Sequence, residues 1–342
     1  MIFVAGKNMI DLHLHLDGSL SIEDFKYLAE RNHIDLGKDF PKNVYVPEGC
    51  TSLEEYLTRF DLPCSLLQDE FSIAYVTASL VNRLYNSGYI YAEIRFAPQL
   101  HTLRGMSQEN AVLAAISGLK YALKDKKGFD ANLILCCMRQ SSTEVNMEAI
   151  KLADKYRTEK VVAVDLAGPE AFHTGDFYTP LFDEAQFRDL NITIHAGEAC
   201  GSDEVIRCID LLHAQRIGHG VHLELTRENI RKMTEKRIAY EFCPTSNLQT
   251  TSLPDYKSVP IREFDKYGIM VTINSDNMTV SDTNVLKEYK HLYKEFKLQQ
   301  HEVRHFLTNS IQSSFAPLEV KTMLMNELAK RIDAYYEKII TD

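Results

Sequence analysis

The sequence predicts one α/β domain over residues 1–342, a (β/α)8 TIM barrel, because strand-like and helix-like segments alternate eight times. Several of the strand-like segments are apolar throughout, as expected when both faces of a parallel sheet are buried. Such a barrel takes roughly 250 residues. The surplus falls to a helical insertion at about 41–86, after the first strand, and to extra C-terminal helices. A doubly wound open sheet is the alternative, but no Gly-x-Gly-x-x-Gly follows the first strand.

The first predicted strand, Met9–His15, carries two histidines on one face. Apolar and polar residues alternate along it, so the side chains of His13 and His15 point to the same side. Two imidazoles placed in this way form a chelating pair for a metal ion, although a solvent-facing hairpin would present them equally well. Asp17 follows in the loop, either as a free side chain or as a plain helix-start carboxylate.

After a first helix near 22–31, apolar residues recur at helical spacing from 53 to 60, and a longer helix covers about 69–86. We expect this insertion to cover the end of the first strand as a lid. The repeating units then follow in order. The expected strands are 89–98, 132–138, 161–168, 191–195, 216–220, 238–244 and 270–275, and the helices between them lie at 108–124, 146–156, 178–189, from 203, 227–236 and 261–267.

Titratable side chains stand where the predicted strands end. In a barrel these ends share one rim, which is where catalytic sites of this fold are built. The candidates are His13 and His15 on the first strand, Asp165 on the fourth, His195 with Glu198 on the fifth, His219 on the sixth and Asp276 on the eighth. Three imidazoles and one carboxylate suit a zinc-like ion with a position left for water, and the remaining groups suit proton transfer.

Composition narrows the classes of function. The formal net charge is −10 and the pI about 5.7, so a nucleic-acid-binding surface is not expected. Seven scattered cysteines with no Cys-x-x-Cys indicate neither a disulfide framework nor a thiolate zinc site, which fits the cytoplasm. The opening Met1 to Ala5 is too short for a signal-peptide core, and no apolar stretch approaches the roughly 20 residues that span a bilayer.

Seven ordered motifs together resemble the adenosine/AMP deaminase family of the metal-dependent hydrolase superfamily along almost the whole chain. They are His13-Leu14-His15-Leu16-Asp17-Gly18-Ser19-Leu20, Tyr91-Ala92-Glu93-Ile94-Arg95-Phe96-Ala97-Pro98, Val164-Asp165-Leu166-Ala167-Gly168, His195-Ala196-Gly197-Glu198, Arg216-Ile217-Gly218-His219-Gly220, Cys243-Pro244-Thr245-Ser246-Asn247 and Asn274-Ser275-Asp276.

The resemblance implies a role for each site residue. One zinc ion is held by His13, His15, His195 and Asp276. His219 orients and deprotonates the zinc-bound water, and Glu198 protonates purine N1. The Gly168 backbone N–H meets N3 and Asp17 meets the ribose 5′-hydroxyl, while an apolar gate is formed by Leu57, Phe60 and Leu62.

One position departs from the family pattern. Many members carry a second Asp directly after the metal-binding one, where this chain has Asn277. The contact to purine N7 is therefore in question, although an amide N–H can still donate to that acceptor.

The resemblance implies hydrolytic deamination of adenosine, and of 2′-deoxyadenosine, to inosine and ammonia in purine salvage. Other aminopurines remain open. A nucleotide phosphate would meet Asp17 without a compensating cation, and adenine deaminases tend to carry Glu at that position. Two-metal hydrolases of the same superfamily usually place a Lys on the fourth strand, where this chain offers Asp165. A binding barrel without catalysis is the non-enzymatic alternative, although every expected ligand and proton carrier is present.

Overall fold

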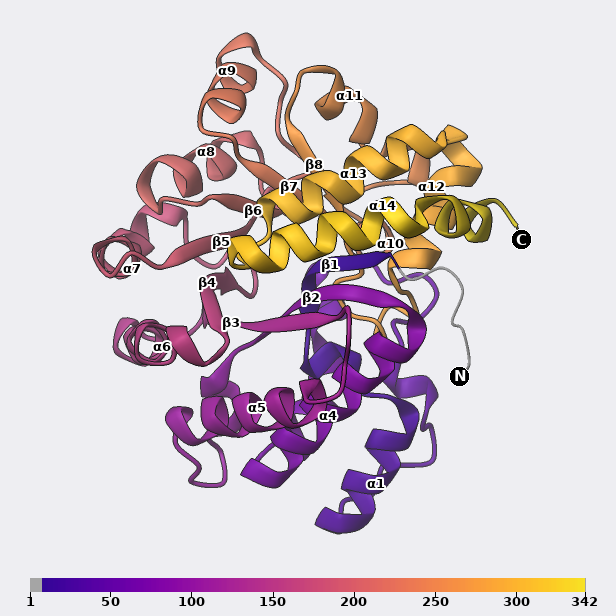
Figure 1. Ribbon diagram of the computed structural model, residues 1–342. Coiled ribbons are helices and arrows are strands. Elements are labelled where there is room, and N and C mark those ends of the chain that lie inside the picture. The colour runs from indigo at the N-terminus through magenta and orange to yellow at the C-terminus, as the bar shows by residue number, and fades with distance from the viewer. Residues whose placement is uncertain (1–7, 342) are drawn as a thin grey trace.

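The computed structural model describes residues 8–341, and the eight predicted strands form one parallel barrel (Figure 1). Each strand pairs with the next in chain order. The strands are β1 (Met9–His15), β2 (Tyr89–Phe96), β3 (Asp130–Met138), β4 (Val161–Ala167), β5 (Asn191–Ala196), β6 (Arg216–His219), β7 (Ala239–Phe242) and β8 (Met270–Ile273). The opening segment 1–5, judged too short for a signal peptide, lies outside the described residues.

The barrel closes where the chain leaves β8 and returns to β1. Leu14 forms a parallel bridge with Asp276. The backbone N–H of His15 donates to the Asp276 carbonyl at 2.8 Å, and the Asp276 N–H donates to the His13 carbonyl at 2.8 Å. Closure therefore places the side chain of Asp276 beside the two histidines of the first strand.

Helices surround the barrel, as the alternating pattern predicts (Figure 1). They are α1 (Ile22–Asn32), α2 (Leu53–Leu57), α3 (Asp61–Leu66), α4 (Glu70–Ser87), α5 (Gln108–Leu123), α6 (Thr143–Lys155), α7 (Thr179–Phe187), α8 (Ser202–Leu211), α9 (Arg227–Glu235), α10 (Pro244–Gln249), α11 (Ile261–Lys266), α12 (Val285–Phe296), α13 (Gln300–Ser313) and α14 (Leu318–Ile340).

The insertion between β1 and β2 begins with less helix than the sequence suggests. Residues 41–52 contain a single 3-10 turn, because prolines and a glycine interrupt this stretch. Regular helices then follow with clear end signals. Asp69 caps α4 by accepting from the Ser72 N–H, and Gly88 ends it with φ 101°. Helix α1 is capped by Ser21, whose side chain accepts from the Asp24 N–H.

The C-terminal helices pack on the outer wall of the barrel beside β8 and β1, and the turn between α13 and α14 reaches the end of the barrel away from the predicted site. Helix α13 packs on β8 and β1, and α14 packs on α13 (Figure 1). In the turn between them, the Ser313 carbonyl accepts from the Arg216 guanidinium at 3.1 Å, and the Phe315 N–H donates to Glu93 at 2.6 Å. This turn therefore lies at the amino-terminal end of the barrel, and the opposite, carboxyl-terminal rim is free to form an active site.

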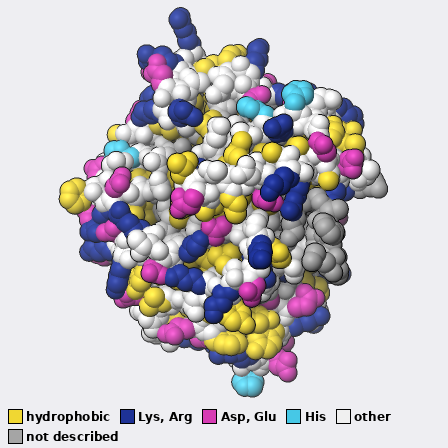
Figure 2. Space-filling model, viewed as in Figure 1, with side chains coloured by type: hydrophobic (Ala, Val, Ile, Leu, Met, Phe, Trp, Pro, Cys, Tyr) yellow, Lys and Arg dark blue, Asp and Glu magenta, His cyan; other side chains and the backbone are white. Residues whose placement is uncertain are grey.

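On the face shown in Figure 2, lysine and arginine side chains are interspersed with acidic ones. This mixed pattern differs from the continuous basic stripe of a nucleic-acid-binding surface. Within residues 8–341, every helix is too short or too polar to cross a membrane.

Candidate active site

Four side chains that the sequence singles out converge at the carboxyl rim of the barrel. His15 Nε2 lies 3.2 Å from His195 Nε2 and 3.4 Å from Asp276 Oδ1. The Nε2 atom of His13 lies 3.5 Å from the same Asp276 oxygen. Tetrahedral zinc with ligands at about 2.0–2.1 Å needs ligand atoms roughly 3.3–3.4 Å apart. These three separations are close to that spacing, and His13, His15 and Asp276 form a group that could hold one small divalent cation, with His195 next to His15.

The surroundings of the histidines also suit a metal. The Nδ1 atom of His13 lies 2.8 Å from Glu241, and the Nδ1 atom of His195 lies 3.1 Å from Asp165. Carboxylates accept these N–H groups, which leaves the Nε2 lone pairs free to face one another. The buried Nε2 of His13 has no hydrogen-bond partner among the described residues. A cation would satisfy it, so the residues fit a metal centre. Asp165 lies behind His195, as a support to the ring.

Glu198 lies beside this centre on the turn after β5. Its Oε1 accepts from the Thr250 hydroxyl at 3.1 Å, and its Oε2 lies 3.7 Å from His219 Nε2. Burial, and then the nearby Asp276 carboxylate, raise the pKa of Glu198 to about 8. Glu198 therefore carries a proton at neutral pH, as a general acid requires.

His219 ends β6 and faces the same centre. Burial holds its pKa well below the ordinary value, so the ring is neutral. The Asn247 side-chain nitrogen lies 3.0 Å from its Nδ1, and an amide nitrogen only donates. This arrangement puts the ring hydrogen on Nε2, where it can orient a water. To deprotonate a water, the ring would need its hydrogen on Nδ1 and a free lone pair on Nε2. This requires the Asn247 amide to be flipped, so that its unpartnered oxygen accepts from Nδ1.

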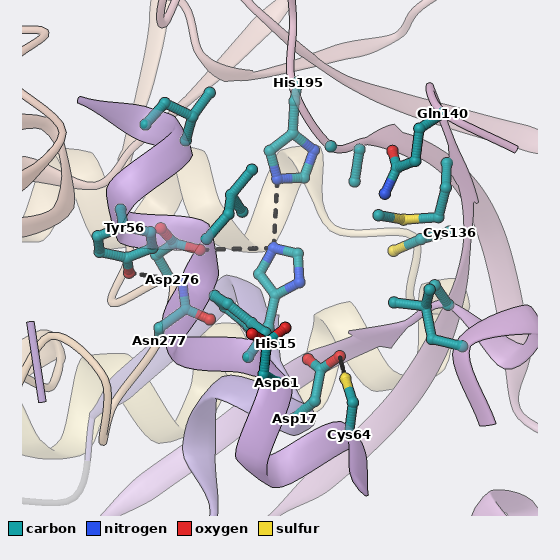
Figure 3. Close-up of a pocket in the computed structure, with 18 of the residues that line it drawn as sticks. His15, Asp17, Tyr56, Asp61, Cys64, Cys136, Gln140, His195, Asp276 and Asn277 are labelled. Atoms are coloured by element: carbon teal, nitrogen blue, oxygen red, sulfur yellow. Dashed lines mark hydrogen bonds and ion pairs between the residues drawn. The ribbon is translucent and has the colours of Figure 1, made fainter. Parts of the chain in front are cut away.

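A cavity of about 430 Å³ opens above these groups, within the range of small-molecule sites (Figure 3). The carboxyl groups of its lining are those of Asp17, Asp61, Glu198 and Asp276, and no lysine or arginine lines it in the described part of the chain. The cavity also contacts five predicted substrate-binding residues: Asp17, Gly168, Asn277, Leu57 and Phe60.

Leu62, expected at the apolar gate, is absent from the cavity lining and packs on the hydrophobic core. Leu57 and Phe60 are three residues apart and share a face, together with Tyr56, Cys50 and Val280. Leu62 is two residues beyond Phe60, so it points to another side of the helical segment.

Asp17 lies next to Cys64 in Figure 3, with its carboxylate facing the Cys64 sulfur. Its carboxylate accepts from the Gly18 N–H at 3.1 Å, and burial raises its pKa to about 6. Above that pH it is an ionised acceptor, which favours a hydroxyl group and disfavours a phosphate.

Asn277 is almost completely buried, at 2% exposure. Its amide nitrogen donates to the Tyr56 hydroxyl at 2.8 Å, and this hydroxyl lies 2.8 Å from Ser281 Oγ (Figure 3). Since the amide nitrogen can only donate, Tyr56 accepts from it and donates to Ser281. One hydrogen of the amide is thereby taken by the insertion, and the other is available to a ligand.

Comparison with known proteins places this site in a family. The family model for adenosine deaminase matches residues 9–331. The adenosine deaminase of Haemophilus ducreyi is 43% identical over 336 residues, which is 96% of this chain and 97% of that protein. The chain belongs to the adenosine deaminase family. The adenosine deaminase of Clostridium acetobutylicum is 36% identical, over 93% of this chain and 96% of its own length.

Solved deaminase structures share the fold. An adenine deaminase from Arthrobacter aurescens superposes with a TM-score of 0.86 at 25% identity, covering 96% of this chain and 100% of that one. An N6-methyl-AMP deaminase from Arabidopsis superposes with a TM-score of 0.85 at 27% identity, again covering 96% and 100%. The chain is therefore a hydrolytic deaminase of a metal-dependent family, and its cluster of His and Asp side chains could hold a metal ion.

Sequence reasoning missed the buried charges that support the site. Glu241 accepts from Arg95 at 2.8 Å and also contacts Arg216 at 2.6 Å. Although burial alone would raise it, these guanidinium groups hold the pKa of Glu241 well below its usual range. Arg95 also donates to Asp165 at 3.0 Å. The sequence does contain a signal for these pairs: Arg95, Arg216 and Glu241 lie in strands predicted to be buried on both faces, and a buried charged residue must be paired with an opposite charge.

Proposed function

We propose that this protein is a zinc-dependent adenosine deaminase, which converts adenosine and 2′-deoxyadenosine to inosine and 2′-deoxyinosine with release of ammonia. The observation that supports it best is the convergence, on one cavity wall, of four candidate metal ligands and a buried, protonated Glu198. Three imidazole nitrogens with one carboxylate oxygen suit zinc among the common divalent ions.

The residues act on the purine as follows. When bound at this centre, zinc supplies Lewis-acid activation of water near neutral pH. Glu198 delivers its proton to N1 as the water oxygen adds to C6, and His219 orients that water through Nε2. One proton of the added water restores Glu198 and the other passes to the C6 amino group. The C6–N bond then breaks with its electron pair leaving on ammonia, and the C6 oxygen remains as the carbonyl of inosine.

The rest of the cavity orients the nucleoside. The Gly168 N–H donates to N3, and Asn277 donates its second amide hydrogen to N7. Asp17 accepts from the ribose 5′-hydroxyl, while Leu57 and Phe60 form the apolar gate at the cavity mouth. The acidic, lysine-free lining favours a nucleoside over a nucleotide. All seven cysteines are free, which suits the reducing cytoplasm, where we place the enzyme.

A substrate panel tests this function. Purified protein is given adenosine, 2′-deoxyadenosine, adenine and AMP, and ammonia release is measured for each. We expect the two nucleosides to have kcat/KM well above those of adenine and AMP. A preference for adenine or AMP would assign a different aminopurine, and no turnover of any of them would favour a binding barrel.

A further inference from the structure

Glu170 binds the turn that carries Glu198, although it belongs to a different strand loop. It follows β4 by three residues and is 3% exposed. Its carboxylate accepts from four consecutive backbone N–H groups at 2.5 to 3.0 Å, those of Gly197, Glu198, Ala199 and Cys200. Its Oε1 accepts from Gly197 and its Oε2 accepts from the other three, so one carboxylate serves all four donors.

The strand ladder does not hold this part of the rim together. Strands β4 and β5 pair only near their starts, at Ala163 with Asn191 and Val164 with Ile192. Beyond these pairs, the loop after β4 meets the turn after β5 through Glu170. Asp165 contacts His195 between the strands, and the Glu170 carboxylate joins the two segments beyond the strand ends.

Two predicted purine contacts lie on either side of this link. Gly168 is two residues before Glu170, and Glu198 is one of the residues whose N–H it binds. Purine N1 and N3 flank C2 in the rigid six-membered ring, so the donors that meet them must keep a fixed separation. Positioning errors near 1 Å can cost about 10²-fold in rate.

We propose that Glu170 is a positioning residue that fixes the Glu198 acid relative to the Gly168 N–H, and thereby sets the register of the purine against the proton donor. The inference rests on the proposed deaminase function. It predicts that Glu170 acts through its negative charge and its paired oxygens, because a neutral side chain offers fewer acceptor positions for the same four N–H groups.

Two substitutions separate this role from simple support of the fold. In Glu170→Gln an NH₂ group replaces one oxygen and faces at least one N–H donor that this oxygen accepted, so the turn must move. We expect kcat for adenosine to fall about 10²-fold, with a much smaller change in KM and with metal content unchanged. In Glu170→Ala the four N–H groups remain as an empty anion site, so we expect added sodium formate to restore part of kcat.

The control proteins are assayed with and without the same added formate. Formate should not restore Glu170→Gln, whose side chain still fills the site, and it should not change wild type or Glu263→Ala, an exposed acid on α11. If Glu170→Ala does not fold, the kcat and KM of Glu170→Gln decide alone. A Glu170→Gln enzyme with wild-type kcat, a loss confined to KM, or a folded alanine variant that formate does not restore would overturn the inference. Wild type that fails to deaminate adenosine would instead refute the proposed function.

Discussion

Replacing Asn277 with Leu should penalise adenosine through the loss of one hydrogen bond to purine N7. Leucine has nearly the same shape as asparagine and leaves the packing over Gly18 intact, but it has no N–H. The side chain is buried, and Tyr56 takes only one of its amide hydrogens. An acceptor left unpaired in such a closed site costs about 1–3 kcal/mol, or roughly 5- to 150-fold in kcat/KM.

The assay compares adenosine with 7-deazaadenosine, which has a C–H in place of N7. Asn277→Leu also removes the bond to Tyr56, but that loss is common to both nucleosides and cancels in the ratio of their kcat/KM values. We expect the penalty on adenosine alone. Tyr289→Phe is the matched control, because this buried hydroxyl has no partner among the described residues. An equal penalty on both nucleosides, or none, would show that Asn277 does not contact N7.

Three further outcomes are expected. Because Glu198 must be protonated and burial raises its pKa to about 8, kcat should fall above about pH 8. Glu198→Gln should lose about 10²- to 10⁴-fold in kcat while still binding purines. Turnover by this variant within a few-fold of wild type would exclude Glu198 as the acid. Asp17→Ala should weaken adenosine more than 5′-deoxyadenosine in kcat/KM, and an equal loss would assign Asp17 to the loop alone. Burial raises the pKa of Glu288 from 4.5 to about 7. The neutral side chain therefore makes its full contribution to the stability of the fold below pH 4.5, and this contribution is lost as the pH rises through 7. At pH 8 the free energy of unfolding of Glu288→Gln, measured with denaturant, should therefore exceed that of wild type by up to about 3 kcal/mol. At pH 4 the two proteins should be similarly stable. Equal stability at pH 8 would contradict the burial argument.

The strands and most helices could be predicted because period and end signals are local. Apolar runs bounded by Gly and Pro mark each strand, and the alternation in Met9–His15 places its two histidines on one face. Helix α10 was not predicted, because Pro244-Thr245-Ser246-Asn247 has the composition of a turn. Proline at its first position instead starts the helix.

The supporting contacts could not be predicted from one sequence. Tyr56 and Asn277 lie 221 positions apart, and Glu170 and Glu198 lie 28 apart, so only the closed barrel brings them together. Local patterns carry no information on such pairs. Motif resemblance named the groups expected to face the substrate, whereas the contacts that support them follow from packing.

Dependence of adenosine turnover on metal tests the central claim most directly. The metal is removed with a chelator, zinc is added back in steps, and inosine formation is measured alongside the zinc bound per chain. We predict that the metal-free protein is inactive and that activity rises in proportion to zinc until about one ion is bound per chain, whereas His13→Ala with His15→Ala binds none and stays inactive. Full activity in protein shown by elemental analysis to hold no metal would contradict the account.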